Sequence, residues 1–208
     1  MSNTNNIFMP EGHMDQLYYS KNTIVRFAHN SRLNSITNEV PGKDKLKILD
    51  AGCGEGHLIE RLYRKNKNNF YYGIDITKIA IQKAKDRCPY ATVKLCDLSK
   101  INFDDGFFDV VICTEVLEHI YNYHIAITEL KRVLRPEGLF IVTFPNEFLL
   151  TVGRFFLRRK PIKVPDHVNS FTPNKMIDAV SLDVIKKKNL PFNFPFFISL
   201  YGLIKFKK

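Results

Sequence analysis

The stretch KLKILDAGCGEG, residues Lys45 to Gly56, decides the fold of this chain. It begins as a short apolar run and ends in three glycines spaced two apart, and the helix-like segment His57 to Lys67 follows at once. This order predicts a strand, a tight turn and a helix. Glycines at such a turn allow a ligand to approach the free backbone N–H groups at the start of the helix. The stretch therefore predicts a nucleotide-binding turn.

An acidic residue, Asp50, precedes the first glycine of this turn by two positions. The glycine spacing is G-x-G-x-G, whereas turns that bind a dinucleotide pyrophosphate have G-x-G-x-x-G. A carboxylate would repel a pyrophosphate at the helix start but would attract a cationic, amino-acid-like ligand. On the turn alone, a dinucleotide site and a purely structural glycine loop remain the alternatives.

Two further acidic residues follow predicted strands. Asp75 lies at the carboxyl end of a strand over residues 69–76, 25 residues beyond Asp50. In nucleotide-binding βαβ units an acid at that place accepts hydrogen bonds from both ribose hydroxyls. A helix over residues 78–87, with Thr77 as its expected cap, and a third strand over residues 91–96 come next, and Asp97 follows them. Three acids at three strand ends predict one ligand site along that edge of the sheet.

The next elements continue the alternation of strands and helices. The nearly continuous apolar run from Phe107 to Thr114 is typical of a central strand that is covered on both faces. We expect a helix over Ala126 to Leu134, a fifth strand over Leu139 to Phe144, and a later helix started by Thr172-Pro173. This order predicts a parallel sheet with right-handed crossovers and a ligand at the carboxyl ends of the strands.

The segments LDAGCGEG, residues 49–56, and LKRVLRPEG, residues 130–138, resemble class I S-adenosylmethionine (SAM) dependent methyltransferases, in particular the methyltransferase type 11 and ubiquinone-pathway O-methyltransferase group. Five motifs in the family's order cover roughly residues 46–146. The resemblance implies an α/β fold with a single doubly wound, mostly parallel sheet flanked by helices, which is the Rossmann-like methyltransferase fold. It also implies SAM as the cofactor. The implied cofactor-binding residues are Asp50, Gly52 and Gly54 for the methionine part, Asp75 and Ile76 for the ribose, Asp97 and Leu98 for the adenine, and Thr114.

The same resemblance predicts a single methyltransferase domain over residues 1–208. Residues 1–40 would form an N-terminal helical lid, and residues 41–145 the cofactor-binding core. Residues 146–171 would be an insertion on the acceptor side, and residues 172–208 a C-terminal helix and strands. For the end of the chain, Phe192 to Lys208, an antiparallel last strand and a short helix are both open.

Candidates for the chemical step follow the fourth strand in Glu115-Val116-Leu117-Glu118-His119. If this stretch is helical, Glu115, Glu118 and His119 lie on one face, and His167 follows later in the chain. The pattern is similar to the metal-binding set of the ubiquinone-pathway O-methyltransferases and of small-RNA terminal 2′-O-methyltransferases. Three interpretations stay open: a divalent metal ion held by all four residues, a metal-free catalytic base at His119 or His167 beside Glu118, and a purely helix-orienting role for Glu118 and His119.

The net charge of +10 is concentrated in the last third of the chain. Residues 148–165 contain five Lys or Arg residues and residues 184–208 contain six, and neither segment contains an Asp or Glu. This pattern is compatible with an anionic acceptor, RNA, an anionic lipid surface or a solvated face.

The remaining features suit a protein of the cytoplasm. We expect neither a signal peptide nor a transmembrane segment, and we expect the four cysteines to be free thiols. The predicted function is methyl transfer from SAM to a small-molecule acceptor at oxygen. The alternatives are methylation of RNA, of the 2′-O type and with or without a metal, and a non-catalytic SAM-binding protein.

Overall fold

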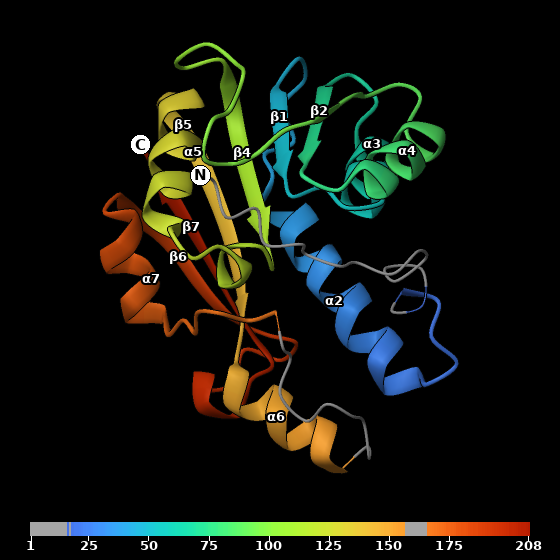
Figure 1. The fold of residues 1–208 in the computed structure, drawn as a ribbon, viewed down its shortest axis with the longest axis vertical. Coiled ribbons are helices and arrows are strands. Elements are labelled where there is room, and N and C mark those ends of the chain that lie inside the picture. Colours follow the sequence, from blue (N-terminus) through green and yellow to red (C-terminus); the bar gives the residue numbers. More distant parts are fainter. Residues whose placement is uncertain (1–15, 17, 157–165) are drawn as a thin grey trace.

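The computed structural model describes residue 16, residues 18–156 and residues 166–208 of the chain. Seven strands form one sheet with the order β3-β2-β1-β4-β5-β7-β6 (Figure 1). The strands β1 to β5 are parallel to their neighbours, and β7 runs antiparallel to both β5 and β6. The predicted mostly parallel sheet is confirmed. The strands are β1 (Lys47–Ala51), β2 (Phe70–Asp75), β3 (Thr92–Leu95), β4 (Phe108–Thr114), β5 (Leu134–Pro145), β6 (Asp183–Leu190) and β7 (Tyr201–Lys207).

Helices cover both faces of this sheet. The α-helices are α2 (Thr23–Glu39), α3 (His57–Lys65), α4 (Lys78–Arg87), α5 (Tyr123–Val133), α6 (Glu147–Phe156) and α7 (Pro173–Val180), and the short 3-10 helices are η1 (Leu117–His119) and η2 (Phe196–Ile198). One hydrophobic core joins α2, α3 and α4 to the sheet, and a second core joins α5 and α7 to its other face. Because helices pack on both faces of the sheet, the predicted doubly wound arrangement is confirmed.

Strand β4 shows why the two cores lie where they do. Val110 and Ile112 belong to the core under α2, α3 and α4, whereas Val111 and Cys113 belong to the core under α5 and α7. All four side chains are buried. Because successive side chains of a strand point to opposite faces, an apolar run without polar interruption is what a strand covered on both faces requires.

The structure departs from the expected boundaries in two places. Helix α5 begins at Tyr123, three residues before the expected Ala126, and β5 begins at Leu134 instead of Leu139. The residues between Leu134 and Leu139, which we expected to separate the helix from the strand, therefore form the first part of β5. Leu134 pairs with Phe108, and the register shifts between Phe108 and Val110. At the end of the chain both open possibilities occur, because η2 is a short helix and β7 is the antiparallel strand.

The expected helix caps have different outcomes. The Thr172 hydroxyl accepts a hydrogen bond from the Lys175 N–H at the start of α7, with Pro173 in the first turn, as predicted. Thr77 is the N-cap residue of α4, as predicted, but its side chain makes no capping hydrogen bond.

Two other expectations concern free thiols at the cysteines and the lack of a transmembrane segment. All four cysteines are free. Among the helices of the described residues, none is long and apolar enough to cross a membrane.

Candidate active site

The glycine turn joins β1 to α3 in a left-handed backbone conformation. Gly52, Gly54 and Gly56 have φ angles of 80°, 51° and 84°. A Cβ atom on Gly52 would overlap Cγ2 of Val116, so this position has room for glycine only. The Gly52 and Cys53 N–H groups donate to the Ile74 carbonyl at 2.8 and 2.9 Å, which fixes the turn against β2. The predicted strand, turn and helix are confirmed.

Asp50 lies next to the end of β1 and is 2% exposed. Its Oδ1 atom has no hydrogen-bond partner among the described residues. Burial, together with the nearby Asp75 carboxylate, raises the pKa of Asp50 to about 7. A buried carboxylate without a partner is unfavourable, and a cationic donor group would relieve it. The geometry therefore suits the cationic ligand that the sequence predicts.

Asp75 ends β2 and is also buried. Its Oδ2 accepts a hydrogen bond from the Gly54 N–H at 2.9 Å, and its Oδ1 accepts one from the Thr77 N–H at 2.8 Å. Asp75 thus connects the glycine turn to the end of β2. Each oxygen keeps a second lone pair for a hydroxyl donor. The neighbouring Ile76 is exposed at the same strand end.

The other two strand ends hold the remaining predicted cofactor residues. Asp97 follows β3, is exposed, and accepts a hydrogen bond from the Ser99 N–H at 2.8 Å. Leu98 is buried beside it. Thr114 ends β4 and is partly buried. Because β3, β2, β1 and β4 are neighbours in a parallel sheet, the structure brings these residues to one edge.

The stretch from Glu115 to His119 is not one helix, so the condition for a shared face of Glu115, Glu118 and His119 is not met. Glu115 has a φ angle of 53°, and only Leu117 to His119 form a turn, the 3-10 helix η1. A left-handed residue ends regular right-handed helix, so Glu115 does not share a helical face with Glu118 and His119. Its carboxylate instead contacts Arg32 Nη1 at 3.0 Å and accepts a hydrogen bond from the Thr143 hydroxyl at 3.1 Å.

Glu118, His119 and His167 do converge. One ligand atom from each of these residues lies within 4.8 Å of the others, and Glu115 is not in this group. The rings of His119 and His167 are 4.7 Å apart between centroids. The N–H groups of Val168 and Asn169 donate to the Glu118 carbonyl at 2.9 and 3.0 Å, which holds the segment after His167 against η1. We call Glu118, His119 and His167 the carboxylate–imidazole cluster.

Each imidazole of the cluster is oriented through Nδ1. His119 Nδ1 lies 3.0 Å from the Asp166 carbonyl oxygen, and His167 Nδ1 lies 2.6 Å from Glu147 Oε1. A carbonyl only accepts, so His119 Nδ1 carries the proton and its Nε2 has a free lone pair. An ionised Glu147 does the same for His167. Both rings are thus arranged as ligands or bases.

Glu118 is a buried carboxylate in the candidate site with a strongly raised pKa. It is 1% exposed, and neither carboxylate oxygen has a hydrogen-bond partner among the described residues. Burial and the nearby Glu115 raise the pKa of Glu118 well above its usual range. Burial also lowers the pKa of His119, and His167 adds to that effect. Glu118 is therefore either protonated or in need of a cation.

The sequence did not point to Arg32 or Glu147. Arg32 comes from α2, within the predicted lid, and is buried against Glu115. Glu147 begins α6 within the predicted insertion and pairs with His167. A signal for Glu147 existed, because it is an acid two residues beyond the end of β5, as Asp97 is beyond β3. Arg32 had no such signal.

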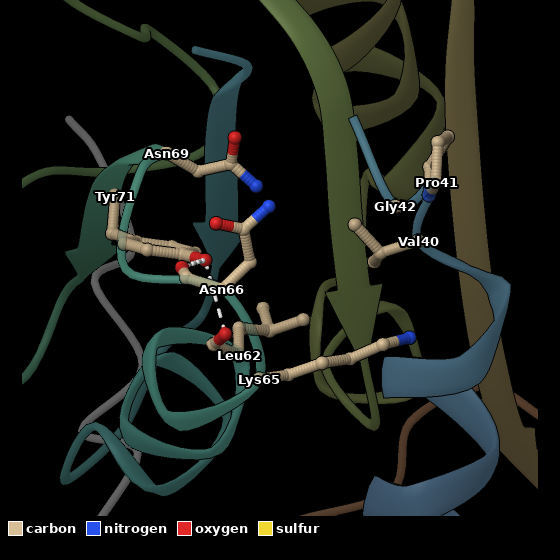
Figure 2. A pocket seen from close by; sticks show the side chains of 8 residues that line it. All are labelled: Val40, Pro41, Gly42, Leu62, Lys65, Asn66, Asn69 and Tyr71. Atoms are coloured by element: carbon tan, nitrogen blue, oxygen red, sulfur yellow. Dashed lines mark hydrogen bonds between the residues drawn. The ribbon is translucent and has the colours of Figure 1, made fainter. Parts of the chain in front are cut away.

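Two pockets lie against helix α3. The smaller one has a volume of about 110 Å³, and Figure 2 shows the side chains that line it. Its lining residues lie shortly before β1 and at the amino end of β2, whereas Asp50 and Asp75 lie at the carboxyl ends of these strands. Its Tyr71 hydroxyl is satisfied by the Leu62 and Asn66 carbonyls at 3.0 and 2.6 Å. The larger one, of about 330 Å³, lies between α2 and α3 and is lined by Tyr18, Tyr19 and His57 among others.

Comparison with known proteins identifies the family. A family model described as "Methyltransferase domain" matches residues 42–187. The chain belongs to the methyltransferase domain family. The chain is 31% identical over 191 residues to the mitochondrial ubiquinone biosynthesis O-methyltransferase of Rattus norvegicus, covering 86% of this chain and 54% of that protein. The resemblance to class I SAM-dependent methyltransferases is confirmed.

Solved structures show the same fold. The PH0226 protein from Pyrococcus horikoshii matches this chain with a TM-score of 0.75 at 19% identity, over 96% of this chain and 99% of that one. A TehB-like SAM-dependent methyltransferase from Corynebacterium glutamicum matches with a TM-score of 0.66 at 21% identity, over 94% of each chain. The chain spans about half the length of the first curated relatives that it matches.

Proposed function

We propose that this chain transfers a methyl group from SAM to an oxygen atom of a small-molecule acceptor. The proposal depends on Asp50 beside the glycine turn: this residue is buried, and its Oδ1 atom has no hydrogen-bond partner among the described residues. The ammonium group of the methionine part of SAM is a cationic donor of the kind this oxygen requires. Family membership supports the same conclusion.

The proposed roles of the cofactor residues follow the strand ends. Asp50, Gly52 and Gly54 hold the methionine part, Asp75 with Ile76 holds the ribose, and Asp97 with Leu98 holds the adenine. Thr114 contacts the cofactor from the end of β4. SAM supplies an activated methyl group, so the protein must position the acceptor and remove or stabilise its charge.

We further propose that the carboxylate–imidazole cluster holds a divalent metal ion. The two oxygens of Glu118, which no described residue satisfies, and the two imidazoles form a ligand set that suits Mn, Fe, Co or Zn better than Mg. An ion at this place would polarise the acceptor oxygen and lower its pKa. Glu147 and the Asp166 carbonyl would orient the two imidazoles.

A second candidate for the chemical step is a metal-free base. His167 Nδ1 faces the Glu147 carboxylate at 2.6 Å, and an imidazole so oriented can take a proton from an acceptor hydroxyl through Nε2. In this form Glu118 would be protonated and would bind the acceptor as a hydrogen-bond donor. The metal and base forms of the proposal share the same acceptor position.

Calorimetry with SAM and with its demethylated product tests the cofactor part of the proposal. If neither binds at millimolar concentration, the assignment of the glycine turn is wrong. Product formation from SAM should then be measured with catechols and phenols against matched amines and thiols, and against short RNA. The oxygen acceptor is supported by the names of relatives such as the rat protein, so a preference for amines, thiols or RNA would overturn that part. Binding without turnover of any acceptor would favour a non-catalytic SAM-binding protein.

A further inference from the structure

The larger of the two pockets, between α2 and α3, is separate from the candidate active site. Its volume is about 330 Å³, which lies at the lower end of the range for small-molecule sites. The described residues that line it include no predicted cofactor residue and no member of the carboxylate–imidazole cluster. Its walls come from the two tyrosines before α2, from α2 and from α3, and we call it the α2–α3 pocket. Its size suits a ligand with a single ring.

One wall of the α2–α3 pocket is aromatic. The ring centroids of Tyr18 and Tyr19 lie 4.5 and 6.0 Å from that of His57, the first residue of α3. Tyr18 is 5% exposed, and its hydroxyl accepts a hydrogen bond from Arg32 Nη2 at 3.2 Å, so this ring is fixed. Tyr19 is 65% exposed and lies open to a ligand. Rings arranged in this way favour a planar apolar partner.

A second wall carries two arginines of α3. Arg61 and Arg64 are three residues apart, so their side chains lie on one side of the helix. Arg61 donates to the Asn30 carbonyl at 3.3 Å, to Asn30 Oδ1 at 2.7 Å and to Asn34 Oδ1. None of these partners is charged, and a guanidinium has five N–H donors. Among the described residues, two donors of Arg61 therefore have no partner, and its charge has no carboxylate beside it.

The acids near the pocket are already paired. Glu60, the one acid among the described lining residues, contacts Arg64 at 2.5 Å and Arg87 of α4 at 3.4 Å. Glu55, which contacts the imidazole of the pocket wall, pairs with Lys83 Nζ at 3.5 Å. The amino end of α3, at the same wall, adds the positive end of a helix dipole. The α2–α3 pocket is therefore net positive.

The basic segment over residues 184–208 differs from the pocket, because its lysines have carboxylate partners within the chain. Lys186, Lys188 and Lys205 contact the buried Glu39 carboxylate at 3.0, 2.7 and 3.8 Å. These contacts hold β6 and β7 to the end of α2, so the three lysines have a structural role. The α2–α3 pocket is therefore the stronger candidate for binding an anion.

The two walls together select the class of ligand. A metal ion or an organic cation would lie beside the arginines, which is unfavourable. A carboxylate or a phosphate group matches the planar N–H fork of a guanidinium. Inorganic phosphate alone would leave the aromatic wall without a contact. A ring that carries an oxyanion uses both walls at once.

We propose that the α2–α3 pocket binds a small aromatic anion, a single ring that carries a carboxylate or a phosphate group. The charged group binds Arg61 and Arg64, and the ring packs against Tyr18, Tyr19 and His57. Because His57 directly follows the glycine turn, an occupied pocket contacts the helix that this turn starts. The site is additional to the cofactor and acceptor sites. The proposal does not rest on methyl transfer, since binding is measured without SAM or acceptor.

Isothermal titration calorimetry with phenyl phosphate and with benzoate tests the proposal and separates the two charged groups. At low salt at least one of these probes should bind the full chain at one site with a Kd of about 1 mM or lower, as expected for a single-ring ligand. Benzyl alcohol, the uncharged probe, should bind at least roughly tenfold more weakly, because it offers the arginines no oxyanion. The double variant Tyr19→Ser/Arg64→Gln removes an exposed ring and an exposed charge from the pocket, and it should lose at least roughly tenfold in affinity for the anion.

The matched control is Phe70→Ser/Lys85→Gln, which removes one exposed ring from β2 and one exposed charge from α4, both outside the pocket. It should bind the anion within about twofold of the unchanged chain, and circular dichroism should show all three proteins folded. No binding of either anion at about 10 mM, equal affinity for benzyl alcohol, or equal affinities of the two double variants would overturn the proposal. So would complete displacement of the bound anion by SAM, because the anion would then occupy the cofactor site.

Discussion

The buried Arg32 of α2 and the partly buried Glu115, directly after β4, form an ion pair, with Arg32 Nη1 3.0 Å from Glu115 Oε2. The pair joins the N-terminal helix to the edge of the sheet where the candidate site lies. Burial raises the pKa of Glu115, and the Arg32 charge opposes that effect. The positive charge of Arg32 thus offsets the negative charge of Glu115, a carboxylate beside the carboxylate–imidazole cluster.

Replacement of Arg32 by Met should destabilise the fold strongly. It leaves the partly buried Glu115 carboxylate without its charged partner, and the loss of one member of a fully buried pair, which sets the upper limit here, costs about 3–5 kcal/mol. Urea unfolding would measure this change. The control is Arg26→Met, earlier on the same helix and exposed, which should change the free energy of unfolding by less than about 0.5 kcal/mol. A loss below about 1 kcal/mol for Arg32→Met would contradict the role of the pair.

Replacement of Gly52 by Ala should distort the turn. The residue has a φ angle of 80°, and its new Cβ atom would overlap Val116. Strain of this kind costs on the order of 1–3 kcal/mol. Gly42→Ala is the matched control, because a Cβ atom added to Gly42 would have nothing within 4 Å and the residue has no positive φ angle. Thermal unfolding of both variants should show a lower melting temperature for Gly52→Ala only.

The ligand-free protein should lose stability as the pH rises through the range from about 4 to about 7. The pKa of Asp50 is raised from 3.8 to about 7 in the folded chain, so the folded state binds more protons than the unfolded state over this range. The stabilisation from protonated Asp50 is full below about pH 4 and is lost above about pH 7. Its upper limit is about 4 kcal/mol.

Asp50→Asn should remove part of this pH dependence. The variant should be more stable than the unchanged chain at about pH 8 and similar to it at about pH 4, as measured by urea unfolding across that range. Asp86→Asn, on the exposed side of α4, is the control and should leave the slope unchanged. Parallel curves for Asp50→Asn and the unchanged chain would show that Asp50 titrates normally.

Asp75→Ala should weaken SAM binding by more than roughly tenfold. It removes two hydrogen bonds from ribose hydroxyls to a charged acceptor, each contributing roughly 1.5–3 kcal/mol. It also removes the acceptor for the Gly54 N–H, so the glycine turn loses a support. Calorimetry gives the affinity, and the melting temperature without ligand separates the two effects. Unchanged affinity would mean that the ribose lies elsewhere.

Glu118→Gln and Glu115→Gln should differ in metal binding. Glu118 belongs to the carboxylate–imidazole cluster, whereas Glu115 is held by Arg32 and Thr143. We expect Mn²⁺ or Zn²⁺ to bind the unchanged chain at one site, and Glu118→Gln to lose at least roughly tenfold in affinity. Glu115→Gln should lose less than about threefold. Equal losses of metal affinity in the two variants would show that Glu115 is also a metal ligand.

Removal of the metal should separate the two forms of the proposed chemistry. A chelator should abolish methyl transfer and leave SAM binding intact, because the ion serves the acceptor. If activity survives the chelator, the His167 base oriented by Glu147 becomes the better account. Glu147→Gln would then lower turnover and shift its pH profile, since the carboxylate no longer holds His167 in one tautomer.

The central fold was predictable because its signals are local. The glycine turn, the apolar run of β4 and the cap at Thr172 each act over a few residues, and periodicity fixes the elements between them. The acids at the strand ends were predictable for the same reason, since parallel strands end at one edge of the sheet.

The rest of the candidate site depends on contacts that spacing does not encode. The left-handed backbone at Glu115 turned its carboxylate away from the expected helical face and towards Arg32, far earlier in the chain. Glu147 pairs with His167 across 20 residues that include α6. Residue types at regular intervals give no signal for Arg32, and although Glu147 follows a strand end as Asp97 does, spacing does not predict its pairing with His167. The division of the chain into lid, core, insertion and C-terminal part stays a prediction.

The sheet order has a consequence for how the chain assembles. Strand β7 lies between β5 and β6, so β6 leaves the ribosome before the strand that links it to the sheet. During synthesis β6 has no native neighbour until β7 follows, and β7 must enter between β5 and β6 as an internal strand. Loss of the segment from Tyr201 to Lys207 would therefore release two strands from the sheet, and with them the lysines that surround Glu39.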